Sequence, residues 1–165
     1  MANRTDFVSV VTDYWKFNSI YFWGGNGEGT VTLKIGTIIE QENSAHNAAR
    51  VLRHIADLVD KGHNLERSRA MDCSGLVVAA LRELGIIGQT EDYRAKDLQK
   101  MSKPVELNKL KPGDLVFDKR ENATHCGVYD GFDMVIEAQG RDVGVTRSKL
   151  SSGRWAVGGR LKYFS

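Results

Sequence analysis

Two residues of the chain, Cys73 and His125, could do nucleophilic chemistry together. Cys73 comes directly after Asp72, and the apolar residues that follow recur at helical spacing until Gly85. Asp72 is a good helix N-cap, so Cys73 is expected at the first helical position. There the unpaired N–H groups and the positive end of the helix dipole favour the thiolate, which is the nucleophilic form of cysteine. The alternative interpretation is a small buried cysteine that takes no part in chemistry.

A base for this thiol is expected on a strand in the second half of the chain. Residues 110–117, 124–131 and 132–140 form alternating or apolar runs joined by turns, which predicts an antiparallel meander. Side chains alternate between the two faces of a strand, so His125 should lie on the face opposite to Cys126. A cysteine on a helix, a histidine on a strand and a polar residue on the next strand would supply a nucleophile, a base and an orienting group.

The orienting residue has two candidates, Glu137 and Gln139. Both lie on the same face of the third strand, so alternation does not choose between them. A glutamate turned to solvent is the alternative interpretation of Glu137.

Five short motifs resemble the NlpC and p-sixty family of cell-wall cysteine peptidases. In order they are Tyr-Phe-Trp-Gly-Gly at 21–25, Asp-Cys-Ser-Gly-Leu-Val at 72–77, Pro-Gly-Asp-Leu-Val at 112–116, His-Cys-Gly-Val-Tyr at 125–129, and Glu137, 12 positions after His125. The resemblance covers roughly residues 5–25 and 71–165. The chain departs from the family pattern in two ways. Residues 26–70 form a longer insertion than the usual loop, and the third polar position is more often His, with Asn or Gln as variants, than Glu.

The resemblance implies a papain-like α+β fold in which the helix that carries the nucleophile packs on a small, mainly antiparallel sheet. A length of 165 residues with 41% hydrophobic residues suits one core, so residues 1–165 are expected to form a single domain that includes the 26–70 insertion. That insertion is expected to contain a strand through Val31, Leu33 and Ile35. An amphipathic helix should follow, capped by Asn43 or Ser44. The segment either covers part of the core or forms a lid or wall over the catalytic cleft.

The remaining segments receive simpler predictions. Thr5 is expected to cap a first helix, and Trp23 is expected in an aromatic core. Residues 86–111 should be a connector with a short helix around 93–101, and residues 154–164 a closing strand with a Gly-Gly bulge or bend.

The resemblance also implies an activity and a set of site residues. Cys73 would attack an amide carbonyl, with His125 as base and Glu137 as the orienting residue. Asp72 and Ser74 would bind the free amine of an N-terminal L-alanine in a peptidoglycan stem peptide, and Tyr21 would offer its hydroxyl group to the substrate. The implied bond lies between D-glutamate, or D-isoglutamine, and the third, diamino residue.

Two other functions are compatible with the same residues. One is a cysteine amidase or deamidase that acts on a protein or on a small γ-glutamyl compound. The other is a non-catalytic wall-binding module, although the presence of both Cys73 and His125 speaks against it.

Composition excludes several partners. The formal charge is +2 and basic residues alternate with acidic ones, so no nucleic-acid surface is expected. Two cysteines on separate elements should not pair, and three histidines in the insertion lack ligand spacing for a metal; no cofactor is expected.

No leader and no long apolar run is present, so neither a signal peptide nor a membrane span is expected. A protein made in the cytoplasm would then reach the wall after lysis, as a phage lysin does, or through a phage tail or secretion system. The oligomeric state is not indicated.

Overall fold

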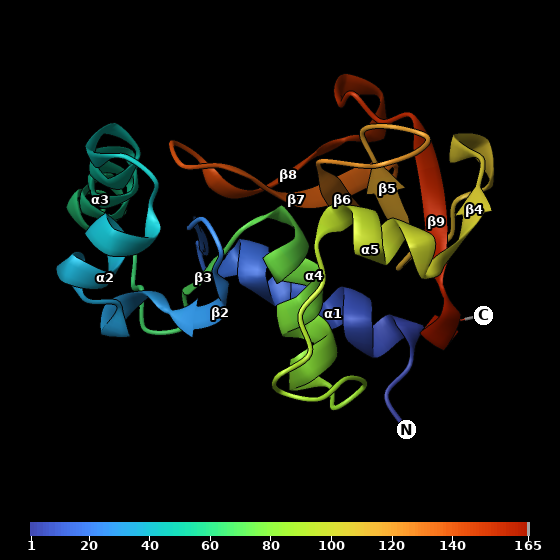
Figure 1. Ribbon diagram of the computed structural model, residues 1–165, viewed down its shortest axis with the longest axis horizontal. Helices are drawn as coiled ribbons and strands as arrows, with labels where there is room; N and C mark the ends of the chain where they lie inside the picture. The colour runs from blue at the N-terminus through green and yellow to red at the C-terminus, as the bar shows by residue number, and fades with distance from the viewer. Residues whose placement is uncertain (165) are drawn as a thin grey trace.

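The computed structural model describes residues 1–164 and combines helices with two sheets (Figure 1). The helices are α1 (Arg4–Lys16), α2 (Ile35–Gln41), α3 (Ala45–Asp60), α4 (Cys73–Glu83) and α5 (Ala95–Lys100). The strands are β1 (Ile20–Tyr21), β2 (Asn26–Gly29), β3 (Arg69–Met71), β4 (Ser102–Val105), β5 (Leu115–Phe117), β6 (Cys126–Tyr129), β7 (Met134–Gly140), β8 (Gly144–Lys149) and β9 (Val157–Leu161). The expected α+β class is confirmed.

The larger sheet is antiparallel and has the strand order β4-β9-β5-β6-β7-β8. Its centre is the expected meander of β5, β6 and β7. The smaller sheet has the order β1-β3-β2, with β1 and β3 parallel. It leads directly into the helix that carries Cys73, because β3 ends at Met71 and α4 begins at Cys73.

Helix α4 lies at the centre of the molecule, between the two sheets and beside α1 (Figure 1). Its residues from Gly75 to Leu81 are all buried, which explains why the helix is apolar on every side. Gly75 packs directly against the small sheet: a Cβ atom at this position would lie 1.8 Å from the carbonyl oxygen of Gly25. The two glycines therefore let the 21–25 segment approach the start of α4 closely.

The insertion contains the expected helix but not the expected strand. Ser44 caps α3, whose buried residues join a second apolar cluster with Ile20, Phe22 and Ala70. Residues 30–32 form a 3₁₀ turn, and α2 follows from Ile35. The strand prediction was wrong because β2, just before this segment, already occupies the free edge of β3. The alternating apolar residues Val31 and Ile35 are left exposed.

The structure also corrects expectations about the cap of the first helix, the edge strands and the closing strand. Asn3, not Thr5, caps α1 and accepts the N–H groups of Thr5 and Asp6. Strands β4 and β8 were not expected, since both are edge strands of mostly polar residues. β9 begins at Val157 and pairs in regular register through both glycines, which serve close packing rather than a bend. None of the helices within residues 1–164 is both long enough and apolar enough to span a membrane.

Candidate active site

Cys73 occupies the first position of α4, as its spacing from Asp72 predicts. The Asp72 carboxylate accepts the N–H of Gly75 at 2.7 Å and thereby caps the helix. Within the part of the chain that the structure describes, the N–H groups of Cys73 and Ser74 have no acceptor. Both are thus free to donate to a negatively charged oxygen beside the thiol.

His125 is held at the start of β6 by Asp118. One carboxylate oxygen of Asp118 accepts the backbone N–H groups of Thr124 and His125, at 2.9 and 3.0 Å. The other accepts the Thr124 hydroxyl group. Gly127 leaves room for an indole, because a Cβ atom there would come within 3.2 Å of Trp155. The Trp155 ring stacks on the His125 ring, with centroids 5.5 Å apart and an interplanar angle of 13°.

The structure places Glu137, rather than Gln139, against the histidine. A Glu137 carboxylate oxygen contacts Nε2 of His125, and the side chains of both residues are largely buried. Gln139 is exposed and accepts the Thr146 hydroxyl group at 2.9 Å. The other ring nitrogen of His125, Nδ1, does not contact Glu137, and Cys73 lies close enough to the imidazole to raise its pKa. The Cys73 thiol donates to the carbonyl oxygen of Thr124, the residue before His125, at 3.9 Å. Cys73, His125 and Glu137 therefore lie in a row, with the imidazole between the thiol and the carboxylate, as in a catalytic triad. We call this row the Cys73 series.

The electrostatics of this series favour a thiolate and an imidazolium. A hydrogen bond from the Cys126 thiol, together with the hydrogen bond and charge of His125, lowers the pKa of Cys73 to about 5 in spite of burial. Burial by itself would lower the pKa of His125, but its contacts with Cys73 and Glu137 outweigh that effect and raise the pKa to about 9. Between these two values Cys73 is a thiolate and His125 an imidazolium, which is the protonation state that a cysteine nucleophile requires.

Cys126 lies much closer to Cys73 than the sequence suggested. Both cysteines are free, but the Cys126 thiol donates to the carbonyl oxygen of Cys73 at 3.4 Å. The two side chains also interact directly. Strand alternation correctly sends Cys126 to the face away from His125, but α4 packs on that face and its first turn sits over Cys126. The neighbouring Cys73 side chain and full burial raise the pKa of Cys126, so it remains a thiol and a donor.

A cleft of about 330 Å³ opens on one side of Cys73. It brings together the three residues expected to bind substrate, Tyr21, Asp72 and Ser74, and is completed by Trp23, Arg94, Ala95, Lys96, Ala123 and Thr124. Trp23 is 47% exposed and belongs to this wall, so the expectation of a core residue was wrong. The buried carboxylate of Glu42 accepts the Trp23 N–H at 2.9 Å, and this bond holds the aromatic segment out of the core.

Asp72 faces the cleft while it caps the helix. Its second carboxylate oxygen accepts the N–H of Gly24 at 2.9 Å, and the Ser74 hydroxyl group donates to the first. Burial raises the pKa of Asp72 to about 6, although these hydrogen bonds oppose the rise. Tyr21 lies near the thiolate, and burial and that charge raise its pKa to about 12. The Tyr21 hydroxyl group is therefore a proton donor at neutral pH.

Asp118 and Trp155 support the site but were not among the sequence candidates. Asp118 had a weak signal, as an acidic residue directly after a strand, in a position where side chains often bind backbone N–H groups of a turn. Trp155 had none, because its place on His125 depends on the chain returning from β8 to β9. Among residues 1–164 no group of three or more His, Cys, Asp or Glu side chains is arranged to hold a metal ion.

Comparison with known proteins identifies the family. Residues 61–158 match the model of the NlpC/P60 family, and the chain belongs to this family. It is 37% identical over 93 residues to the murein DD-endopeptidase MepH of Escherichia coli, a match that covers 51% of this chain and 32% of MepH. The matched part is thus only about a third of that relative.

Solved structures show the same fold. The NlpC/p60 domain of the peptidoglycan hydrolase SagA superposes with a TM-score of 0.61 at 14% identity, over 97% of this chain and 100% of that chain. RipD of Mycobacterium tuberculosis, described as a non-catalytic NlpC/p60 domain protein, superposes with a TM-score of 0.60 at 16% identity, over 98% and 99% of the two chains. The papain-like arrangement of helix and sheet implied by the motifs is that of this family.

Proposed function

We propose that the protein is a cysteine peptidase that hydrolyses an amide bond in the peptide part of peptidoglycan. The observation that carries the proposal is the series of Cys73, His125 and Glu137, with the thiol at the start of a buried helix and its pKa lowered to about 5. A cysteine kept only for packing would have no imidazole and carboxylate aligned behind it.

Each residue has a defined role in the proposed reaction. The Cys73 thiolate attacks the amide carbonyl carbon, and the carbonyl oxygen becomes an oxyanion that the free N–H groups at the start of α4 stabilise, with the Tyr21 hydroxyl group as a further donor. The His125 imidazolium protonates the leaving amine, the C–N bond breaks and a thioester remains. His125 then takes a proton from water, the resulting hydroxide attacks the thioester, and Cys73 leaves as thiolate.

We place the acyl part of the substrate in the cleft lined by Tyr21, Asp72 and Ser74. The Asp72 carboxylate in the lining of this cleft suits a free amine, such as that of an N-terminal L-alanine, and the family resemblance favours cleavage after D-glutamate. Because the pKa of Asp72 is raised to about 6, its charge, and with it amine binding, should be lost as the pH falls through that value.

The similarity to MepH supports a second candidate bond. The name of that relative describes a murein DD-endopeptidase, which would place the cleaved bond in a cross-link between two stems. The same catalytic series serves either bond, and the cleft decides between them. The similarity to RipD supports a third possibility, a wall-binding domain without catalysis. A cysteine amidase or deamidase acting on another γ-glutamyl compound is a fourth.

Purified muropeptides, incubated with the protein and analysed by mass spectrometry, separate these functions. A new free amine on the third, diamino residue of a monomeric stem marks cleavage after D-glutamate. Conversion of cross-linked dimers into monomers marks a DD-endopeptidase. Unchanged muropeptides that nevertheless bind the protein would support the wall-binding function, and unchanged muropeptides without binding would favour the amidase.

We further propose that residues 1–165 act as a single unit in which the insertion supports the wall that Trp23 forms in the cleft. Gln41, at the end of α2, donates to the carbonyl oxygen of Trp23 at 2.8 Å, and Glu42 accepts the N–H of the same residue. Arg141, from the turn between β7 and β8, pairs with Glu42 at 2.7 Å. In Figure 1 this turn reaches toward α2 and α3, which stand beside the small sheet rather than over α4.

Action on peptidoglycan would take place outside the cytoplasm, after lysis or through a delivery apparatus such as a phage tail or secretion system.

A further inference from the structure

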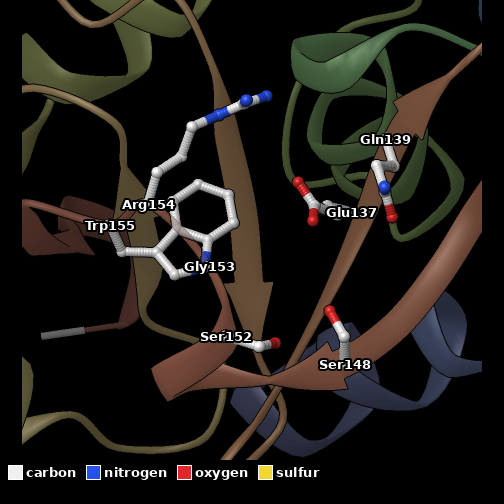
Figure 2. Close-up of a pocket in the computed structure, with 7 residues that line it drawn as sticks. All are labelled: Glu137, Gln139, Ser148, Ser152, Gly153, Arg154 and Trp155. Atoms are coloured by element: carbon white, nitrogen blue, oxygen red, sulfur yellow. The ribbon is translucent and has the colours of Figure 1, made fainter.

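A second, strongly polar pocket lies on the other side of His125 from the Cys73 cleft. It has a volume of about 360 Å³ and is lined by Glu137, Gln139, Ser148, Ser152, Gly153, Arg154 and Trp155. Figure 2 shows Arg154 and Trp155 on one side, Glu137 and Gln139 on the other, and the two serines at the base. Two of its lining residues, Trp155 and Glu137, contact the His125 ring. The pocket therefore begins at the residue that protonates the leaving amine.

The position of this pocket relative to Cys73 and His125 indicates which part of a substrate it would bind. The acyl carbon bonds to Cys73, so the acyl part stays in the cleft of Tyr21, Asp72 and Ser74. The leaving nitrogen must meet His125 to be protonated. A chain attached to that nitrogen would continue past His125 toward Trp155 and Glu137, which line the polar pocket.

Arg154 is the unbalanced charge of this pocket. Within residues 1–164 it has no ion pair and no hydrogen bond, whereas the neighbouring arginines of β8 and its preceding turn, Arg147 and Arg141, pair with buried acids. Glu137 does not cancel Arg154, because its carboxylate is already matched by the imidazolium of His125. The free guanidinium presents five N–H donors in a fork that fits a carboxylate.

The other polar groups of the pocket extend this donor set. The side-chain hydroxyl group of Ser148 has no partner among the described residues. The carboxamide oxygen of Gln139 accepts from Thr146, so its NH₂ group is left to point to a ligand. Gly153 fixes the indole wall, since a Cβ atom at this position would lie 2.1 Å from Nε1 of Trp155. The fold thus positions the Trp155 wall, the serines at the floor of the pocket and the Arg154 guanidinium.

We propose that this pocket binds a free carboxylate on the leaving-group side of the scissile bond, through the Arg154 guanidinium, with Gln139 and Ser148 as further donors. The inference rests on the proposed function. In a stem peptide such a carboxylate has two sources: the second carboxylate of a diaminopimelate at the third position, which a lysine there lacks, or the terminal carboxylate of the peptide. Arg154 would make the enzyme prefer leaving groups that carry this charge.

Kinetics on three matched peptides test the proposal. All have the sequence L-alanyl-γ-D-glutamyl-X, where X is diaminopimelate with a terminal carboxamide, lysine with a free terminal carboxylate, or lysine with a terminal carboxamide. Arg154→Gln should lower kcat/KM by about tenfold or more on a peptide whose carboxylate is read, and leave the lysine carboxamide nearly unchanged. Arg154→Lys, which keeps the charge without the fork, should lose less. Arg67→Gln is the matched control, because Arg67 stacks on Phe17 away from the pocket.

The peptide that shows the loss identifies the source of the carboxylate. A loss confined to the diaminopimelate peptide assigns the side-chain carboxylate, and one confined to the free lysine acid assigns the terminal group. An equal effect of Arg154→Gln on all three peptides, or no effect on any, would overturn the proposal.

A binding measurement tests the pocket independently of whether the protein hydrolyses peptides. Free diaminopimelate is titrated into isotope-labelled protein, and the indole N–H signal of Trp155, assigned with Trp155→Phe, is followed by NMR. The proposal expects the signal to shift in the wild type and in Cys73→Ala, and to stay still in Arg154→Gln. If the wild type hydrolyses none of the peptides but the signal still shifts, the proposed function is wrong and the pocket stands. If the peptides are hydrolysed and the signal never shifts, the pocket is wrong and the function stands.

Discussion

Replacing Glu137 with Gln should change the pH profile of hydrolysis in a defined direction. The substitution keeps the shape of the side chain and an oxygen acceptor for Nε2 of His125, but it removes the negative charge. The pKa of His125 stands at about 9 against an ordinary value of 6.5, and Glu137 and Cys73 together produce this rise against the effect of burial. The rise corresponds to a few kcal/mol in favour of the imidazolium, at about 1.4 kcal/mol per pKa unit.

If the carboxylate supplies a substantial part of that rise, its loss should lower the basic limb of the kcat/KM profile by about one pH unit. An imidazolium that is less stabilised loses its proton at lower pH. The thiolate–imidazolium pair of Cys73 and His125 is therefore lost at a lower pH in the variant than in the wild type. Turnover at neutral pH should fall about ten- to a thousand-fold, because the imidazole is also less well oriented.

The assay is hydrolysis of a stem peptide from pH 4 to 10, with Gln139→Ala as the control. Gln139 is exposed and contacts Thr146 rather than His125, so its substitution should do far less to turnover and should not move the basic limb. A Glu137→Gln enzyme with wild-type turnover and an unshifted profile, beside an inactive Gln139→Ala enzyme, would refute the reasoning and transfer the role to Gln139.

Three further predictions follow from contacts around the site. Cys126→Ala should raise the pKa of Cys73, because it removes the neighbouring thiol that lowers this pKa, so the acidic limb of activity and the onset of rapid alkylation should both move to higher pH; an unchanged onset would show that the contact is unimportant. Gly75→Ala should destabilise the protein by about 3 kcal/mol in chemical denaturation, since the added Cβ meets a backbone carbonyl, whereas Gly36→Ala, in a helix with open space around it, should be neutral or stabilising; similar effects of both would contradict this packing. Glu42→Gln should raise KM more than it lowers kcat for stem peptides, because it loosens the wall at Trp23, and equal changes in both constants would count against a wall.

The sequence predicted the parts of the site that depend on local rules. The cap at Asp72 and the position of Cys73 follow from helix chemistry, and the face of Cys126 follows from strand alternation. The choice of Glu137 over Gln139 did not follow from alternation, because both lie on one face. It depends on how far along β7 the histidine of β6 reaches, which is a matter of tertiary register, and only the family resemblance favoured Glu137.

Features that depend on long-range packing were missed. The contact between Cys126 and Cys73 arises because α4 packs on the face of β6 opposite to His125. The aromatic type of Trp23 predicts a core position, but its place in the cleft is fixed by Glu42, 19 residues later. The strand expected at 31–35 failed for the same reason: alternation describes what a strand requires, but not whether a neighbouring strand has a free edge for it.

Release of amines from purified peptidoglycan is the most direct test of the central claim that Cys73 is the nucleophile of a wall hydrolase. Wild type, Cys73→Ala and Cys126→Ala are compared at equal concentration, after circular dichroism has shown that all three are folded. The account predicts steady amine release by the wild type, none by Cys73→Ala, and activity in Cys126→Ala with its onset at higher pH. Amine release that survives in Cys73→Ala, or a folded wild type that releases none, would contradict it.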